Sequence, residues 1–254
     1  ARTLCDFRYI TRRFMKRCRG LAKRRVRAIT VQECAEYIDT AFDTPNQRLK
    51  ARRVLSGVFS TAVKRGWCSE NPVAKVEAPR VREKRIEVLK PSEIEKLLDT
   101  AAEYDGGRCL AAVGMMLYAG IRPHEVARLT WEQVDMAGGT ICILPQHSKT
   151  GGARLVTIQP PLARLLQRCQ QGGRVCPPQW AAHWRALRKQ AGFAEWQPDV
   201  LRHTFASYHL RYFRDYTALQ YETGHRDSSL LRTRYVDMRG VVDAAAFWGK
   251  VSAK

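Results

Sequence analysis

The sequence predicts a mainly α-helical fold with a small β-sheet or hairpin, of the α+β class, divided between two domains. Three observations lead to this prediction. Apolar residues recur with a helical period over most of the chain, and the period changes to two only between residues 138 and 158. A charged stretch with neither period lies near residue 80, and 254 residues are enough for two domains.

The first domain is expected to be helical and to comprise residues 1–79. Segment 3–14 has apolar residues at helical spacing, and nine Lys or Arg with no acid follow between Arg12 and Arg27. Thr30 is expected to cap the next helix, with Glu33 completing a capping box. A long amphipathic helix is expected next. It is followed by a proline, which cannot continue a helix, and the first domain ends soon after it. The basic run is either a solvated face or a DNA-facing surface.

The second domain is expected to comprise residues 80–254, after an extended linker over 78–90. Pro91 and Ser92 announce its first helix. The change of period predicts a β-hairpin with a glycine-rich tip between its two strands. The expected helices span 90–104, 108–119, 123–129, 160–170, 179–191, 200–212, 216–222, 229–236 and 241–251, and the strands span 138–144 and 153–158.

The composition points to a polyanionic partner. The chain has 44 Lys and Arg against 24 Asp and Glu, a formal charge of +20. Duplex DNA presents one negative charge per ~1.7 Å of axis, so it is the favoured partner, while an RNA-binding role stays open. The longest apolar run, 109–121, is too short to span a bilayer, so no membrane association is expected.

Eight cysteines are scattered without any Cys-x-x-Cys pair, so no zinc site, and no metal or cofactor of any kind, is expected. Free thiols indicate a reducing compartment, and we expect a cytoplasmic protein.

Arg122 is the first candidate for a functional residue. It follows an apolar run and precedes Pro123, which suits the first position of a helix, and Glu125 lies where an acid favours the helix dipole. Arg122 therefore lies at a helix N-terminus, where anions bind. Taken alone, the residue is better explained as a solvated loop arginine.

Other candidates also have ordinary explanations when they are considered singly. Lys149, in the hairpin turn, is the usual solubilising residue of a tip. Arg202 begins a helix with an apolar face, and Gly224 precedes His225 at the end of another helix. Tyr235 is typical of a core or interface residue.

In sequence order, however, "AGIRPHEVARLTW", a hairpin-turn lysine, "LRHTFAS", "GH" and a terminal tyrosine resemble the tyrosine recombinase (phage integrase) family. "SENPV" before the basic linker and "LKPSEIEKLL" after it resemble the join between that family's core-binding and catalytic domains. The resemblance covers the whole chain. It implies a helical core-binding domain and a mixed α/β catalytic domain that close as a clamp around duplex DNA.

The resemblance also implies the residues that bind the scissile phosphate. Arg122 and Arg202 are similar to the two arginines that clamp it, and His225 resembles the histidine that donates a hydrogen bond to it. Glu125 is similar to the acid that supports the first arginine. Arginine suits this role because its planar fork donates in pairs and keeps its charge at any working pH.

Two further residues would move protons and form the covalent bond. Lys149 is similar to the lysine that protonates the departing 5′ oxygen, and Tyr235 to the nucleophile that forms a 3′-phosphotyrosyl bond. A tyrosine with a pKa near ~10 is a poor nucleophile, so the cationic cluster must help it lose its proton. No ATP is required, because the phosphotyrosine conserves the energy of the broken bond.

The sequence departs from the family pattern in two places. Asp199 stands three residues before Arg202, where the family usually has histidine, and either caps the following helix or holds Arg202 or Arg122 in position. The interval from His225 to Tyr235 is one residue longer than is common. An N-terminal domain that binds arm-type DNA sites is frequent in the family, and no segment here resembles it, so we expect a shortened form.

The sequence therefore predicts a site-specific DNA recombinase or integrase that integrates or excises a mobile element. Its partners would be double-stranded DNA, a homo-tetramer on two DNA sites and, optionally, a directionality factor, in a bacterial, nucleoid-associated setting. Segment 241–251 would be exchanged between neighbours or pack within its own chain. The alternatives are a type IB topoisomerase-like nicking-closing enzyme and a DNA-binding regulator or architectural protein, inactivated at Asp199, on the same fold.

Overall fold

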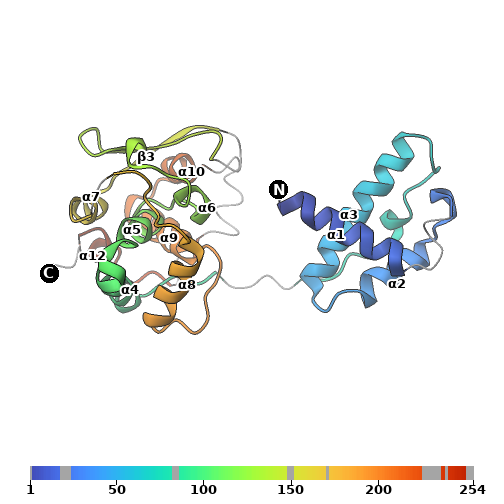
Figure 1. Ribbon diagram of the computed structural model, residues 1–254, viewed down its shortest axis with the longest axis horizontal. Helices are drawn as coiled ribbons and strands as arrows, with labels where there is room; N and C mark the ends of the chain where they lie inside the picture. Colours follow the sequence, from blue (N-terminus) through green and yellow to red (C-terminus); the bar gives the residue numbers. More distant parts are fainter. Residues whose placement is uncertain are drawn as a thin grey trace. The chain divides into compact units, whose positions relative to one another are not determined.

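The computed structural model describes residues 2–17, 24–81, 86–147, 152–169, 172–224, 236–237 and 240–249. The chain divides into two compact units, Ala1–Lys84 and Arg85–Lys254 (Figure 1). Both units are mainly helical, and the second contains one small antiparallel sheet, which confirms the predicted fold class. Within the described ranges, none of the helices combines the length and apolar character needed to cross a membrane.

The first unit is a helical bundle. Its core is built on aromatic and branched side chains, and the Tyr37 hydroxyl donates a hydrogen bond of 2.9 Å to the carbonyl of Ile10. Leu4 and Phe7, in contrast, are 54% and 39% exposed, so the apolar stripe of the first helix is only partly covered. Its elements are α1 (Arg2–Arg17), η2 (Val26–Ala28), α2 (Val31–Thr40), α3 (Pro45–Lys64) and η3 (Pro72–Lys75).

Side-chain caps fix where the helices of this unit begin. The predicted capping box of α2 is confirmed: the Glu33 amide donates to Thr30 Oγ1 at 3.2 Å, and the Thr30 amide donates to Glu33 Oε2 at 2.9 Å. Thr44 and Gln47 form the same arrangement before α3. These bonds satisfy amide groups that have no partner inside a helix.

The second unit surrounds a central apolar helix. All nine residues of α5 are buried, and α5 packs against α4, α7 and α9 (Figure 1). The elements of this unit are α4 (Pro91–Glu103), η4 (Tyr104–Gly107), α5 (Leu110–Tyr118), α6 (Pro123–Val126), η5 (Trp131–Gln133), β1 (Val134–Asp135), β2 (Thr140–Ile143), β3 (Arg154–Thr157), α7 (Pro160–Gln167), α8 (Trp180–Gln190), α9 (Val200–Phe213), α10 (Tyr216–Thr223) and α12 (Ala244–Gly249).

The last described helix packs within its own chain. Helix α12 lies against α9 and α7, and the ring of Phe247 stacks on Tyr208 with centroids 4.3 Å apart. The Trp248 indole donates to the carbonyl of Tyr208 at 3.3 Å. The predicted helix over 229–236 falls mostly on residues outside the described ranges.

The sheet has the order β1-β2-β3, with both pairs antiparallel. Strands β2 and β3 form the predicted hairpin, in which Ile141 faces Val156 and Ile143 faces Arg154. Side chains alternate between the two faces of a strand, so Arg154 and Val156 share one face, and both are buried. A buried arginine on the core face of a strand requires a charged partner inside the unit.

Candidate active site

Arg122 lies where the central helix ends and a short helix begins. Gly120 adopts φ +58°, which turns the chain out of α5, and Pro123 occupies the first position of α6. Arg122 is 9% exposed. A Cβ atom at position 120 would overlap the ring of Phe205, so both the backbone conformation and the packing demand glycine there.

Arg202 ties this turn to another helix end. It is the third residue of α9 and only 1% exposed. One terminal nitrogen of its guanidinium donates to the carbonyl of Gly120, and the other donates to the carbonyl of Thr223, the last residue of α10. The arginine thus holds together the two segments that lead, in the sequence, to Arg122 and to His225.

Glu125 is the anion of the site and is completely buried. Its carboxylate accepts a hydrogen bond from the Arg122 amide at 3.1 Å and another from the Arg122 guanidinium at 3.2 Å. Burial raises the pKa of the Glu125 carboxyl. The hydrogen bond and charge of Arg154, together with those of Arg122, outweigh this effect and leave that pKa below its usual value. The carboxylate therefore stays charged at neutral pH and holds Arg122.

Arg154 is a member of the site that sequence reasoning missed. Its guanidinium grips Glu125 with two hydrogen bonds, 3.1 Å to Oε1 and 2.6 Å to Oε2, and its Nε donates to the carbonyl of Glu222 at 3.0 Å. The available signal was the strand alternation, which puts this arginine in phase with Val156 and Ile158. The described site thus holds three arginines and one carboxylate, a net charge of two positive units.

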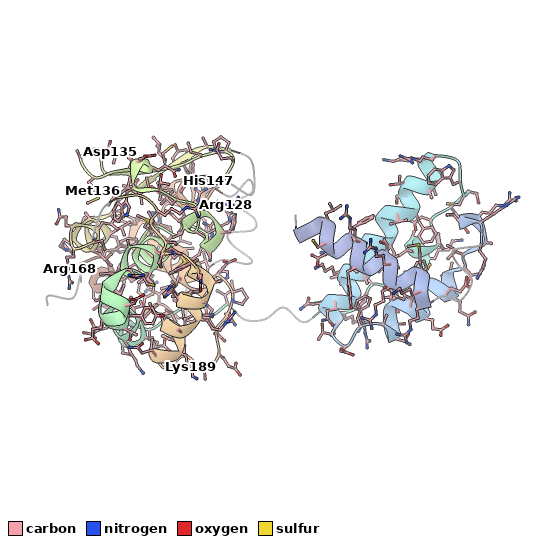
Figure 2. The ribbon with its side chains drawn as sticks, in the orientation of Figure 1. Arg128, Asp135, Met136, His147, Arg168 and Lys189 are labelled. Atoms are coloured by element: carbon pink, nitrogen blue, oxygen red, sulfur yellow. The ribbon has the colours of Figure 1, made fainter. Side chains whose placement is uncertain are left out.

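Strand β3 is also fastened to α10 through polar contacts. The Thr157 amide and hydroxyl donate to the Glu222 carboxylate at 2.9 and 2.5 Å. On the other arm of the hairpin, Arg128 donates to the carbonyl of Gln146 at 3.3 Å, and Arg128 and His147 lie at the same edge of the unit (Figure 2). Strand β3 is therefore anchored to α10, and the segment after β2 is anchored to Arg128, two residues beyond the end of α6.

The capping role predicted for Asp199 is wrong. Asp199 precedes α9, but it has φ 62° and ψ 15°, and its side chain makes no capping hydrogen bond. An N-cap needs an extended backbone to bring its oxygen back to the helix amides, and the left-handed conformation points the carboxylate elsewhere. No ion pair joins Asp199 to Arg122 or Arg202 in the part of the chain that the structure describes.

Asp199 instead borders a small cavity shared with Pro123, Trp184 and Trp196. Its charge reaches His124, next to Pro123. Burial lowers the pKa of the His124 imidazole, Arg122 and Arg128 lower it further, and Glu125 and Asp199 act in the opposite direction; the net pKa lies below its usual value.

Three of the predicted site residues, Lys149, His225 and Tyr235, lie outside the described residues. Of the others, Arg122, Glu125 and Arg202 come together at the junction of α5, α6, α9 and α10, and Asp199 lies beside them. Among the described residues, no three His, Cys, Asp or Glu side chains are grouped closely enough to hold a metal ion. The positive charge at this junction is supplied by arginine.

Comparison with known proteins identifies relatives that match most of the chain. The tyrosine recombinase XerC of Pseudomonas putida is 25% identical over 246 residues, covering 89% of this chain and 82% of XerC. The integrase of Salmonella phage P22 is 26% identical over 199 residues, covering 70% of this chain and 50% of that integrase.

A solved structure shares the fold. A lambda integrase tetramer bound to a Holliday junction matches with a TM-score of 0.74 and 21% identity, covering 100% of this chain and 75% of the integrase chain. The sequence model of the phage integrase family matches residues 87–240, which is more than half of the chain and includes the whole junction described above. The chain therefore belongs to the phage integrase family and is an enzyme of the tyrosine recombinase class.

Proposed function

We propose that this recombinase cuts and rejoins DNA strands at specific sites through a 3′-phosphotyrosyl intermediate. The observation that carries the proposal is the junction at which Arg122 and Arg202 meet, nearly buried, with Glu125 holding the first of them. A scissile phosphodiester is an anion, and its transition state gathers more charge on the non-bridging oxygens. Two pre-positioned guanidinium groups stabilise that charge because they need no reorganisation during the reaction.

The remaining residues complete a balanced displacement. The Tyr235 hydroxyl gives its proton to solvent water and its oxygen attacks phosphorus, the bond from phosphorus to the 5′ oxygen breaks, and Lys149 gives the departing oxygen a proton that it regains from solvent. His225 donates a hydrogen bond to a non-bridging oxygen. A 5′-hydroxyl from the second strand then attacks the phosphotyrosine and reverses these steps, so bond energy is conserved.

The substrate would be duplex DNA, which the charge of +20 supports. Residues 1–79 would form the core-binding domain, and 80–254 would carry the chemistry. Similarity to the P22 integrase, and the fold shared with a tetramer on a Holliday junction, support action as a homo-tetramer that integrates or excises a mobile element. A directionality factor would favour either integration or excision. The reaction would take place on the bacterial nucleoid, in the cytoplasm.

The test is covalent capture. A DNA duplex with a nick beside the cleavage site traps the enzyme, because the short 5′ fragment diffuses away before it can rejoin. Wild type should give a protein–DNA adduct on a denaturing gel, and Tyr235→Phe should give none while binding DNA normally. Tyr221→Phe is a matched control, because Tyr221 is 59% exposed on α10 and takes no part in the proposed chemistry.

An adduct that persists in Tyr235→Phe would assign the nucleophile to another residue. Cleavage by the wild type should also survive EDTA, because arginines supply the positive charge in this mechanism, and a strict dependence on Mg²⁺ would refute it. Relaxation of supercoiled DNA at random sites would favour a topoisomerase-like activity instead.

A further inference from the structure

Arg154 makes three hydrogen bonds at the junction, and the proposed chemistry has no role for it. It begins β3, is 6% exposed, and points to the buried face of the sheet opposite Ile143. Its guanidinium donates twice to Glu125 and once to the carbonyl of Glu222. A buried bidentate pair of this kind is among the most direction-dependent interactions in proteins, since both groups are planar.

Glu125 divides its carboxylate between two arginines. Oε1 accepts from Arg122 at 3.2 Å and from Arg154 at 3.1 Å, while Oε2 accepts from the Arg122 amide at 3.1 Å and from Arg154 at 2.6 Å. The contacts from Arg154 fix the plane of the carboxylate. That plane in turn sets the direction in which the Arg122 guanidinium can be held.

Arg154 also contacts the end of α10. Its side chain lies against Gly224, where an added Cβ would come within 3.0–3.2 Å of the arginine. The Glu222 carboxylate, from the same helix, holds Thr157 of the same strand. The guanidinium that grips Glu125 also donates to the carbonyl of Glu222, so one side chain joins β3 to both α6 and the end of α10.

We propose that Arg154 is a positioning residue that orients the Arg122 guanidinium toward the scissile phosphate through Glu125. This inference rests on the proposed function. The catalytic benefit comes from orientation, because a displacement of about 1 Å in a group that holds the reacting phosphate can cost about 100-fold in rate.

The experiment measures single-turnover cleavage of the nicked duplex by Arg154→Lys and Arg154→Met. Lysine keeps a positive charge near Glu125 but cannot form the two-pronged contact, and methionine keeps only the apolar length of the side chain. Arg108→Met is the matched control. Arg108 also pairs with a carboxylate, that of Asp105 at 3.2 Å, but its side chain is 53% exposed. Melting temperature and DNA affinity are measured for every variant.

A second substrate distinguishes a misoriented Arg122 guanidinium from a folding defect. In a methylphosphonate duplex, a methyl group replaces one non-bridging oxygen, so the scissile centre is neutral and depends less on an aligned cation. Misorientation of the Arg122 guanidinium should therefore slow cleavage of the phosphodiester more than cleavage of the methylphosphonate. A folding defect lowers the amount of active enzyme, so it should slow both substrates by the same factor.

We expect Arg154→Lys to bind DNA as wild type does, to cleave the phosphodiester about 10–100-fold more slowly, and to lose less on the methylphosphonate. Should Arg154→Met fail to fold, Arg154→Lys alone carries the test, because lysine keeps a positive charge beside Glu125, which Arg122 continues to hold.

Equal losses on both substrates, or wild-type rates in the Arg154 variants, would overturn the inference and leave the proposed function standing. Absence of any adduct with the wild-type enzyme would overturn both.

Discussion

Arg202 donates a hydrogen bond from its buried guanidinium to the carbonyl oxygen of Gly120, two residues before Arg122. The opposite nitrogen of the same fork donates to Thr223, one residue before Gly224. One arginine therefore fixes the end of α5 and the end of α10 at once. The residue expected to bind phosphate is also part of the framework that holds the phosphate site together.

Gly120→Ala should destabilise the second unit by about 2–5 kcal/mol. An alanine at φ +58° costs about 1–2 kcal/mol in backbone strain, and its Cβ would overlap the ring of Phe205, which adds about 1–3 kcal/mol of overpacking. The measurement is the free energy of unfolding by denaturant, followed by near-ultraviolet circular dichroism.

Gly139→Ala is the matched control for that variant. Gly139 has φ +65°, but no atom lies within 4 Å of an added Cβ, so only the strain of about 1–2 kcal/mol should appear. Equal losses in the two variants would mean that Phe205 moves aside at no cost.

Asp199 should be replaceable by asparagine without loss of stability, because asparagine also tolerates the left-handed conformation observed at φ 62°. Asp199→Ser and Asp199→Ala should both lose about 1 kcal/mol through backbone strain. Thermal melting of the three variants checks this. Full stability in the serine variant, with a loss only in the alanine variant, would restore the capping role that the backbone geometry excludes.

The same asparagine variant should also change the titration of a neighbour. The Asp199 carboxylate raises the pKa of His124 against the larger effect of burial. Removing that negative charge should therefore lower the His124 pKa further, so the imidazole would be neutral over a wider pH range. The pKa can be followed by the imidazole proton resonances in NMR, with His183 as a second histidine in the same unit. An unchanged His124 pKa would place the Asp199 carboxylate out of its electrostatic range.

Local signals were enough to predict part of this structure. The capping box at Thr30, the turn at Gly120 to Pro123 and the hairpin each depend on residues close together in the sequence. The same kind of rule failed at Asp199, where an aspartate before a helix predicts a cap. The backbone at Asp199 is left-handed instead, and a rule based on the residue type before a helix has no access to that conformation.

The features that could not be predicted depend on contacts between residues far apart in the sequence. The sequence of helix α3 predicts an apolar side formed by Leu49, Val54, Val58 and Val63, but these residues are only partly buried. The contacts of the unit bury Ala51, Leu55, Phe59 and Ala62 instead. Arg154 lies in phase with buried positions, but its partner Glu125 is 29 residues away in the chain. Periodicity can place a charge on the core face, but only the fold identifies what neutralises it.

DNA affinity should fall steeply with salt. If the protein neutralises six phosphates, the logarithm of the association constant should fall with a slope of roughly −5 against the logarithm of salt concentration. Fluorescence anisotropy with a labelled duplex measures it. A duplex of unrelated sequence is the control and should show weaker binding with a similar slope. A flat dependence would mean that the charge of +20 serves another partner.

Glu125→Gln should destabilise the second unit at pH 7 and flatten its response to acid. In the folded protein, Arg154 and Arg122 hold the pKa of Glu125 below the ordinary value of 4.5 despite burial. The charged carboxylate therefore contributes stability that is fully present above about pH 4.5 and is lost as the pH falls through the lowered folded pKa. Glutamine leaves two buried guanidinium groups without an anion, which costs about 3–5 kcal/mol at pH 7, and it has no proton to gain in acid. Urea unfolding at pH values from 7 to about 3 would measure both effects.

Glu33→Gln is the control, because Glu33 also pairs with an arginine, Arg24, but keeps 28% of its side chain exposed, so its contribution is weakened by solvent. If the Glu125→Gln curve runs parallel to the wild-type curve throughout this range, the buried carboxylate does not couple stability to pH, and the arginine contacts do not hold it as a charged group.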